Sequence, residues 1–426
     1  MFRDLRPAHV AIAVALATAA LWSVGIGGGY HFDDAITPIS DPASQSLGAF
    51  ADHLTDTLRP VTKLTYAIEG SLGAGETPAA RRGVNIAIHA GAALLLCLLL
   101  VALAPALTPL GAGCLALLWA VHPIHGESVL AITGRPEALS TLFAIAALLA
   151  HRKHHVRAAV LLALAGLARE TAIAALVPLA VLELSSRARW RVHARRLLPA
   201  AMATALVIVW FVATPRVREL ASFSFDRPIG TSLAHQLAAV PVGLSLYVRT
   251  WALSIDHGDV LPGWLAIVGV AIYAAVIALV VALRHRAPLV ALGGAVWLAA
   301  IVPTQSLVPK LDPLTERPLS FALVGIVLAF AALHRHVRFA LPIVLALAIA
   351  TIARGRTYRS DLLLWADAAS KSETNARPAM NYAYFLHRAG RDDEALRALE
   401  RAHAIDPGDL EITQLRDALA TRHHAP

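Results

Sequence analysis

The chain is poor in charge and in cysteine. Only 15% of its 426 residues are charged, 57% are hydrophobic, and the mean hydropathy is +0.61. That balance excludes an ordinary soluble protein and predicts an all-α, polytopic helical membrane protein. Both cysteines, Cys97 and Cys114, lie inside apolar runs, which indicates small core side chains and argues against a disulfide framework.

Lysine is scarce, whereas alanine and arginine dominate, which is typical of a GC-rich bacterial source. The net charge of +8 does not indicate a nucleic-acid partner, because the basic residues gather in short loops between apolar runs. In a membrane protein such loops face the cytoplasm and its anionic headgroups. The predicted location is therefore a bacterial inner (cytoplasmic) membrane.

Twelve apolar runs are spaced along the chain, and the positive-inside rule orients them. Arg3 and Arg6 place the N-terminus inside, and the basic loops 151–157 and 187–196 also fall inside. If 236–254 lies in the outer interface, or re-enters it, the basic loops 284–286 and 334–338 fall inside as well. This predicts eleven crossings with the C-terminus outside. The runs are 8–27, 84–104, 108–121, 136–150, 157–168, 171–184, 197–213, 236–254, 263–283, 288–304, 318–333 and 339–353.

A cleaved signal peptide is the alternative for the first run. Its apolar stretch is longer than usual, and no clear small-residue cleavage site precedes Asp33. In either case Asp33 and Asp34 face outward. Adjacent carboxylates at a membrane edge need a reason, because unpaired charge near hydrocarbon is costly.

The same topology collects mixed charge on the outer face, as expected of a site built where helices meet. Transfer to a hydroxyl needs a carboxylate base, and a leaving phosphate needs arginine, lysine or histidine beside it. The candidate residues are Asp33, Asp34, Arg59, His122, His125, Glu127, Arg135, Glu137, Arg169, Glu170, Arg249, Lys310, Asp312, Glu316 and Arg317.

Several of these residues also have a simpler, structural interpretation. Arg59-Pro60 alone suits a loop turn, and Arg169-Glu170 suits a helix-end ion pair. His122 and His125 near Glu127 resemble metal-ligand spacing. The intervening Pro123 disfavours a regular helix and no third ligand is evident, so histidines that hydrogen-bond or contact phosphate are favoured.

Four motifs follow one another after the acidic pair, and together they resemble a known family. They are Arg59-Pro60-Val61-Thr62-Lys63-Leu64-Thr65-Tyr66, Asn85-Ile86-Ala87-Ile88-His89, His122-Pro123-Ile124-His125-Gly126-Glu127-Ser128 and Gly134-Arg135-Pro136-Glu137-Ala138-Leu139-Ser140. The order is similar to that of the transmembrane and tetratricopeptide-repeat-containing O-mannosyltransferases and their bacterial relatives, which belong to the GT-C glycosyltransferases. The likeness extends from about Phe32 to Pro407.

The resemblance implies an enzyme with a polyprenyl-phosphate sugar donor and no required metal or other cofactor, although a divalent metal stays open. It implies that Asp33 and Asp34 form the catalytic carboxylate site, with Asp33 as the base. It places Arg135 and the Glu316-Arg317 pair near the donor phosphate. Relatives tend to carry tyrosine and proline after that pair, where this chain has Ser320 and Ala322, which weakens the role of Arg317.

From Tyr358 onward the sequence becomes charged and amphipathic. Residues 376–407 fit one tetratricopeptide repeat, with Gly390 as the turn and Pro407 at the end. One repeat buries its core poorly, so helices are expected at 359–372 and 409–421. The domains are then 1–355, a transmembrane glycosyltransferase domain with outer loops at 28–83 and 214–262, and 358–426, a helical tail that stabilises the fold or docks a partner.

The leading hypothesis is an inverting glycosyltransferase. Asp33 takes the proton of an acceptor hydroxyl, and arginines (Arg59, Arg135, Arg317) with His122 and His125 hold the donor phosphate. The partners would be a polyprenyl-phosphate-linked sugar, membrane lipids and an extracytoplasmic protein or glycolipid acceptor. A lipid-carrier flippase or transporter is one alternative, although no internal repeat is apparent. A non-catalytic membrane-anchored repeat scaffold is the other.

Overall fold

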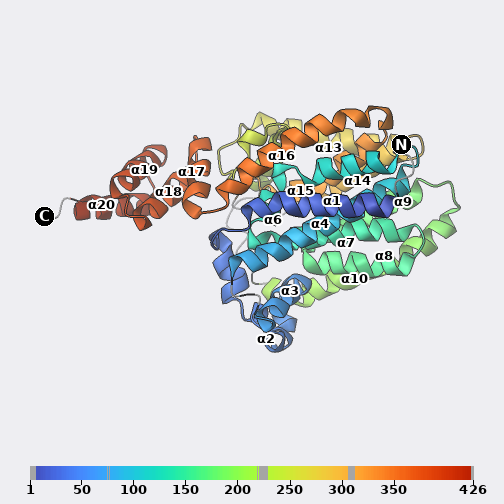
Figure 1. Ribbon diagram of the computed structural model, residues 1–426, viewed down its shortest axis with the longest axis horizontal. Coiled ribbons are helices and arrows are strands. Elements are labelled where there is room, and N and C mark those ends of the chain that lie inside the picture. Colours follow the sequence, from blue (N-terminus) through green and yellow to red (C-terminus); the bar gives the residue numbers. More distant parts are fainter. Residues whose placement is uncertain are drawn as a thin grey trace.

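The computed structural model describes residues 6–73, 75, 77–217, 219, 229–305 and 312–423, and within these ranges the chain is helical with connecting loops and no strand. The long helices lie side by side along the long axis of the molecule, and the C-terminal helices extend from one end (Figure 1). The elements that enclose this bundle are α1 (Pro7–Trp22), α4 (Pro78–Leu103), α5 (Pro109–Ala120), α7 (Arg135–His151), α8 (His155–Ala168), α9 (Leu176–Leu184), α10 (Trp190–Ala213), α12 (Ile229–Leu246), α13 (Trp264–Leu283), α14 (Pro288–Ile301), α15 (Arg317–Ala331) and α16 (Ala340–Thr357).

Six helical segments of the described chain are long and apolar enough to cross a membrane, and four shorter apolar helices accompany them. These helices indicate a membrane-embedded protein. The six are Pro7–Gly25, Pro78–Leu103, Ile132–His151, Trp190–Ala213, Trp264–Leu283 and Ala340–Thr357. Each predicted apolar run overlaps helical structure, but the number of crossings, eleven, stays a prediction.

Segment 236–254 falls on α12 and the short turn η10 (Thr250–Ala252). α12 contains Pro241 and is not among the six span-like helices of the described residues. Tyr247 directly follows α12, and its hydroxyl donates to the Leu319 carbonyl of α15 at 2.9 Å. The placement of segment 236–254 in the outer interface remains a prediction.

Small residues allow the helices of the bundle to approach closely. A Cβ on Gly293 of α14 would lie 2.3 Å from the carbonyl oxygen of Gly325 on α15, and the reverse contact is equally short. In a bilayer the lipid tails are as apolar as the helix surfaces, so helices associate through close backbone packing of this kind. α15 thereby gains a fixed position, and its first residue is Arg317.

Connections at one end of the bundle carry most of the predicted site. The first of them holds η2 (Phe32–Ala35), η3 (Ile36–Ser40), η4 (Pro42–Ser44), α2 (Leu47–Asp52), η5 (Leu54–Asp56) and α3 (Pro60–Ser71). Between α5 and α7 lie η7 (Pro123–His125), α6 (Gly126–Val129) and η8 (Ile132–Gly134). Between α8 and α9 lies η9 (Glu170–Ala175).

The C-terminal unit consists of α17 (Asp361–Lys371), α18 (Arg377–Arg388), α19 (Asp392–Ile405) and α20 (Leu410–His423). Gly390 connects α18 to α19 with a φ of 73°, a left-handed conformation that favours glycine. The repeat predicts that Ala379, Tyr382, Ala383 and Leu386 of the first helix pack against Ala395, Leu399 and Ala402 of the second. All of these are buried except Tyr382, which is partly exposed. Helices α17 and α20 lie where flanking helices were expected, and the assignment as a tetratricopeptide repeat stays a prediction.

Asp259 joins the loop before α13 to the loop before α18. Its Oδ1 accepts hydrogen bonds from the backbone N–H of Glu373 (3.1 Å) and Thr374 (2.8 Å) and from the hydroxyls of Ser372 (3.1 Å) and Thr374 (3.0 Å). Burial alone would raise the pKa of Asp259, but these hydrogen bonds outweigh it and lower the pKa.

We expect Asp259→Ala to loosen this joint, because four donors lose one acceptor. In limited proteolysis, segment 371–377 of this variant should be cleaved several times faster than that of the wild type. The same segment of Asp259→Asn, which keeps an acceptor oxygen, should be cleaved at a nearly normal rate. Equal rates for Asp259→Ala and the wild type would show that this contact does not hold the C-terminal unit.

Candidate functional site

The two carboxylates of η2 lie in different environments, and that of Asp34 has a structural role. Its side chain is fully buried. Oδ1 accepts from the backbone N–H of Thr133 at 2.8 Å and from its hydroxyl at 3.0 Å, and Oδ2 accepts from the backbone N–H of His31 at 3.1 Å. Asp34 therefore fixes η2 against η8 and has little acceptor capacity left for a substrate.

Asp33 is partly exposed, and no described residue donates a hydrogen bond to its carboxylate. Burial is the largest influence and raises the pKa of Asp33. The nearby Arg317 guanidinium lowers it, and the carboxylates of Asp34 and Asp312 raise it further, so that the net direction is upward. An accessible carboxylate with a raised pKa has the properties of a general base.

Arg317, the first residue of α15, lies close enough to Asp33 for their charges to interact. Its Nε lies 2.7 Å from Oε1 of Glu127, and Oε2 of Glu127 accepts from the backbone N–H of Glu316 at 3.1 Å. Glu127 thus orients Arg317 from the far side. No described residue occupies the two terminal guanidinium nitrogens, which leaves them able to bind an anion.

Glu316 holds the next layer of the site. It is fully buried, and its Oε1 accepts from the backbone N–H of Ser254 at 2.6 Å and lies 3.0 Å from Nε2 of His257. Its Oε2 lies 3.6 Å from Nη2 of Arg354, whose Nη1 lies 2.9 Å from Oδ2 of Asp367. Charges from α15, α16 and α17 therefore meet behind Arg317.

His31 links the acidic pair to the C-terminal unit. Its Nδ1 lies 2.6 Å from Oδ1 of Asp361, the first residue of α17, and its Nε2 lies 2.7 Å from the carbonyl oxygen of Tyr358. The glycine-rich segment before His31 is held by Arg82, which is buried and donates to the carbonyls of Gly28 and Gly29 and, at 2.7 Å, of Leu130.

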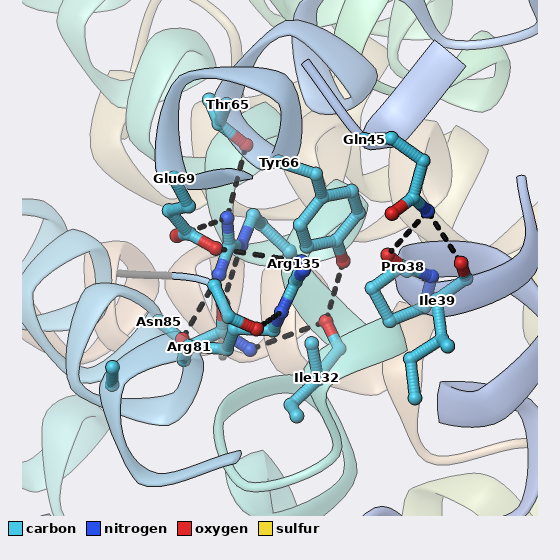
Figure 2. Close-up of polar contacts among 12 residues, drawn as sticks. Pro38, Ile39, Gln45, Thr65, Tyr66, Glu69, Arg81, Asn85, Ile132 and Arg135 are labelled. Carbon is cyan, nitrogen blue, oxygen red and sulfur yellow. Dashed lines mark hydrogen bonds and ion pairs between the residues drawn. The ribbon is translucent and has the colours of Figure 1, made fainter. Parts of the chain in front are cut away.

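Arg135 is fully buried, and its hydrogen-bond and ion-pair partners form a cluster that does not include Asp33. Figure 2 shows its guanidinium surrounded by partners. Nε donates to Oδ1 of Asn85 at 2.7 Å, Nη2 donates to the carbonyl of Arg81 at 2.9 Å, and Nη1 lies 2.5 Å from Oε1 of Glu69. Nη1 also donates to the Thr65 hydroxyl at 3.2 Å. Every nitrogen of Arg135 therefore has a protein partner.

This cluster supports the turn that holds Asp34. The Tyr66 ring, 4.2 Å from the guanidinium carbon of Arg135, donates its hydroxyl to the Ile132 carbonyl at 2.7 Å, and Asn85 donates to the Ala131 carbonyl at 3.1 Å. Thr133, the partner of Asp34, is part of the same turn. Arg135 and Asn85 therefore act on the acidic pair indirectly, by positioning the turn that holds Asp34.

Arg59 and Glu170 form a bidentate ion pair, with Nε to Oε2 at 2.7 Å and Nη2 to Oε1 at 2.6 Å. Arg59 has a left-handed φ of 60°, a strained conformation for a residue with a side chain. Next to it, Nε of Arg169 lies 2.9 Å from Oε2 of Glu137. The helix-end ion pairing considered for this region is present, with Arg59 and not Arg169 as the partner of Glu170.

We expect the Arg59–Glu170 pair to contribute stability that depends on acid pH. Burial opposes ionisation of Glu170, but Arg59 outweighs it and lowers the pKa from 4.5 to about 2. A carboxyl whose pKa is lower in the folded state stabilises the fold above its unfolded pKa, and this stabilisation is lost as the pH falls from 4.5 toward about 2.

Thermal unfolding in detergent at neutral and acid pH measures this effect. The wild type should be more stable than Glu170→Gln at neutral pH, and the difference should shrink through the acid range. Glu411→Gln, at an exposed carboxylate, serves as the control with no such trend. A pH-independent difference for Glu170→Gln would contradict the assigned pKa shift.

Backbone groups contact both ring nitrogens of His122 and Nε2 of His125. His122 lies 3.0 Å from the Tyr247 carbonyl through Nε2 and accepts from the Ile124 N–H through Nδ1 at 3.1 Å. His125 lies 2.7 Å from the Trp119 carbonyl through Nε2. Both are buried. Across the described ranges, no group of three or more His, Cys, Asp or Glu is arranged to hold a metal ion.

The remaining predicted residues are Arg249, Lys310 and Asp312. Arg249 is exposed at the start of η10, beside Trp251, which is also exposed, and no described residue forms an ion pair with it. Lys310 lies outside the described residues. Asp312 pairs with Arg377 of α18, Oδ1 to Nη2 at 2.6 Å.

Sequence reasoning missed His31, Glu69, Arg82, His257 and Arg354 as parts of the site. Glu69, Arg82 and Arg354 lie within helices, where an ionisable residue in an otherwise apolar run is itself a functional signal. Arg354 falls just beyond the end of the predicted run 339–353, and Arg82 just before the start of 84–104. His31 is the first residue of the acidic motif, and His257 follows Asp256 just beyond segment 236–254.

The fold and these loops define a helical membrane protein with a charged, partly open site at one end of its bundle. One curated protein that the chain resembles is a protein O-mannosyl-transferase of Caenorhabditis elegans, 54% identical over 39 residues, which is 9% of this chain and 6% of that protein. The match therefore spans a small part of that relative. No protein-family model matches the chain, and no solved structure matches it.

Proposed function

We propose that the protein is an inverting membrane glycosyltransferase that moves a sugar from a polyprenyl-phosphate donor to a hydroxyl group on an extracytoplasmic acceptor. The observation that carries the proposal is the division of the acidic pair. Asp34 is held by hydrogen bonds within the fold, whereas Asp33 is partly exposed, has a raised pKa and lies close enough to Arg317 for their charges to interact. The short match to an O-mannosyl-transferase supports the same class of reaction.

In the proposed reaction the acceptor oxygen attacks the anomeric carbon of the donor sugar. Its proton passes to Asp33, and the bond between the anomeric carbon and the phosphate oxygen breaks on the opposite face. The polyprenyl phosphate leaves with the bonding electrons, and Arg317 stabilises its charge. The sugar configuration inverts in this single displacement.

The other predicted residues then divide by their contacts. Glu127 and Glu316 are positioning residues for Arg317, and Arg135, Glu137 and Arg169 belong to buried ion pairs that hold the loops. Arg59, Arg249 and Lys310 remain proposed contacts for the donor on its way to the site, and His122 and His125 are proposed as supports of the backbone around α6. Mannose follows from family resemblance alone, and a Ser or Thr hydroxyl of a protein is the proposed acceptor.

The proposed setting is a bacterial inner membrane, with the active site and the C-terminal unit outside the cytoplasm. Repeat-like helices suit protein recognition, so an acceptor protein or other partner would dock on α17–α20. The joint through Asp259 and His31 would bring such a partner near Asp33.

Release of polyprenyl phosphate tests the proposal against its alternatives. Purified protein in vesicles with a polyprenyl-phosphate mannose donor and an acceptor peptide rich in serine and threonine should release polyprenyl phosphate and glycosylate the peptide. A flippase would move the donor across the bilayer without consuming it, and a scaffold would do neither. Either of those outcomes would overturn the proposal, and a panel of other polyprenyl-phosphate sugars identifies the donor.

A further inference from the structure

A groove lies at the end of the bundle away from Asp33, where α7 ends and α8 begins. It has a volume of about 510 Å³ and is bounded by α4, α7 and α8. Its walls are apolar, formed by Leu95, Ala102, Ala146, Leu149, Ala150 and Leu161. An apolar groove on the side of a membrane bundle has the lining that an acyl chain requires.

One end of this groove is strongly basic. Arg152, Lys153, His154 and Arg157 line it, and all four side chains are exposed. No described acidic residue pairs with any of them. The buried carboxylate of Glu183 is already engaged by His193 at 2.9 Å, Arg196 at 3.2 Å and His151 at 3.2 Å. The basic end therefore lacks an anion from the protein itself.

A second hollow of about 440 Å³ adjoins the groove and shares Arg152 and Ala102 with it. His151 and His155 also line this hollow, and the Nδ1 atom of each is buried without a hydrogen-bond partner. The His151 side chain is 1% exposed, so its unpaired nitrogen lies inside the protein and not on its surface. A polar headgroup with hydroxyl groups would satisfy such nitrogens.

We infer that this groove binds an anionic phospholipid of the surrounding leaflet. One acyl chain lies along the apolar walls, the phosphate contacts the four residues 152, 153, 154 and 157, and the headgroup extends toward His151 and His155. Charge complementarity selects this occupant, because an apolar peptide would leave the basic end unpaired and a free phosphate would leave the apolar walls empty. The site is separate from the proposed catalytic centre and independent of the proposed activity.

Lipid retention by the full-length protein tests the inference. Native mass spectrometry from micelles with equal phosphatidylglycerol and phosphatidylcholine should show preferential retention of phosphatidylglycerol by the wild type. Each cation near a lipid phosphate contributes on the order of fivefold in affinity. The triple variant Arg152→Gln, Lys153→Gln, Arg157→Gln should therefore bind on the order of a hundredfold more weakly.

The matched control removes the same charge elsewhere. Arg187, Arg189 and Arg195 lie in another basic segment, are exposed, and do not line the groove. Their triple glutamine variant should retain phosphatidylglycerol as the wild type does. Equal losses in the two triple variants would show a diffuse electrostatic attraction and overturn the inference, as would a wild type with no preference for phosphatidylglycerol.

A further variant separates a lipid from a free phosphate. Ala150→Phe fills the apolar wall without changing any charge, and it should reduce phosphatidylglycerol retention at least tenfold. Displacement of the lipid by glycerophosphate at equal concentration, or unchanged retention by Ala150→Phe, would show that the groove itself is not used and would contradict the proposal.

Discussion

Asp33→Asn should reduce sugar transfer by about 10²–10⁴-fold, because a general base contributes that much to the rate. The same substitution should leave the protein as stable as the wild type or more so. Asp33 has a raised pKa in the fold, so its ionised form costs stability at neutral pH, and a neutral amide removes that cost. Initial transfer rates and thermal midpoints in detergent measure the two effects together.

The neighbouring carboxylate provides the control. Asp34→Ala removes the acceptor of three hydrogen bonds, and each bond to a charged group is worth about 1.5–3 kcal/mol. This variant should lose stability and activity together, whereas Asp33→Asn loses activity alone. Near-normal transfer by Asp33→Asn, or a marked fall in its thermal midpoint, would refute the division of roles within the pair.

The pH dependence of transfer adds an independent check on Asp33. A base must be ionised to accept a proton, so the rate should rise with pH through the pKa of Asp33. Because that pKa is raised, the rise should occur above the range of an ordinary aspartate. Asp33→Asn should lose this rising limb together with its rate.

Arg135→Met should be strongly destabilising, far more so than the removal of Arg59. It leaves Glu69 buried with only Arg81 nearby, Nη1 to Oε2 at 3.7 Å. Breaking a buried ion pair by removing one partner costs about 3–5 kcal/mol. Arg59→Met breaks a pair whose side chains are 34% and 39% exposed, and such pairs are worth about 0.2–1 kcal/mol. Thermal midpoints of the two variants in one detergent give the comparison.

A double variant distinguishes a structural role from phosphate binding. Arg135→Met with Glu69→Leu removes both buried charges, and apolar replacement of a whole buried pair is often neutral. The double variant should therefore recover much of the stability that the single variant loses. A stable Arg135→Met protein whose only defect is a raised KM for the donor would restore Arg135 as a phosphate ligand.

Local sequence features predicted the helices well, and the contacts of single charges poorly. Hydropathy and basic loops located the apolar helices, and small residues at 379, 383, 395 and 402 located the α18–α19 pair, because both signals are contained within one or two helices. The two aspartates look alike in sequence. Their difference depends on Thr133, which is 99 residues away from Asp34.

The same limit explains the arginines. Arg135 and Arg317 both begin helices at the site end and both precede a proline, so a motif cannot separate them. Their partners decide: Glu69, Asn85 and Thr65 enclose Arg135, whereas Glu127 engages only the Nε side of Arg317. Burial and partner geometry arise from tertiary packing, which a single sequence does not encode locally.

The bridge through His31 has a consequence for any shortened form of the protein. If the chain ends before Asp361, the His31 ring loses one of its two hydrogen-bond partners. If the chain ends before Tyr358, the ring loses both. The segment with the two aspartates would then keep its hydrogen bonds to Thr133 but lose those of the His31 ring, even with every bundle helix intact. Tags and fusions are therefore best placed after α20, and a chain cut before Tyr358 should show lower transfer activity, because Asp33 then sits on a less firmly held segment.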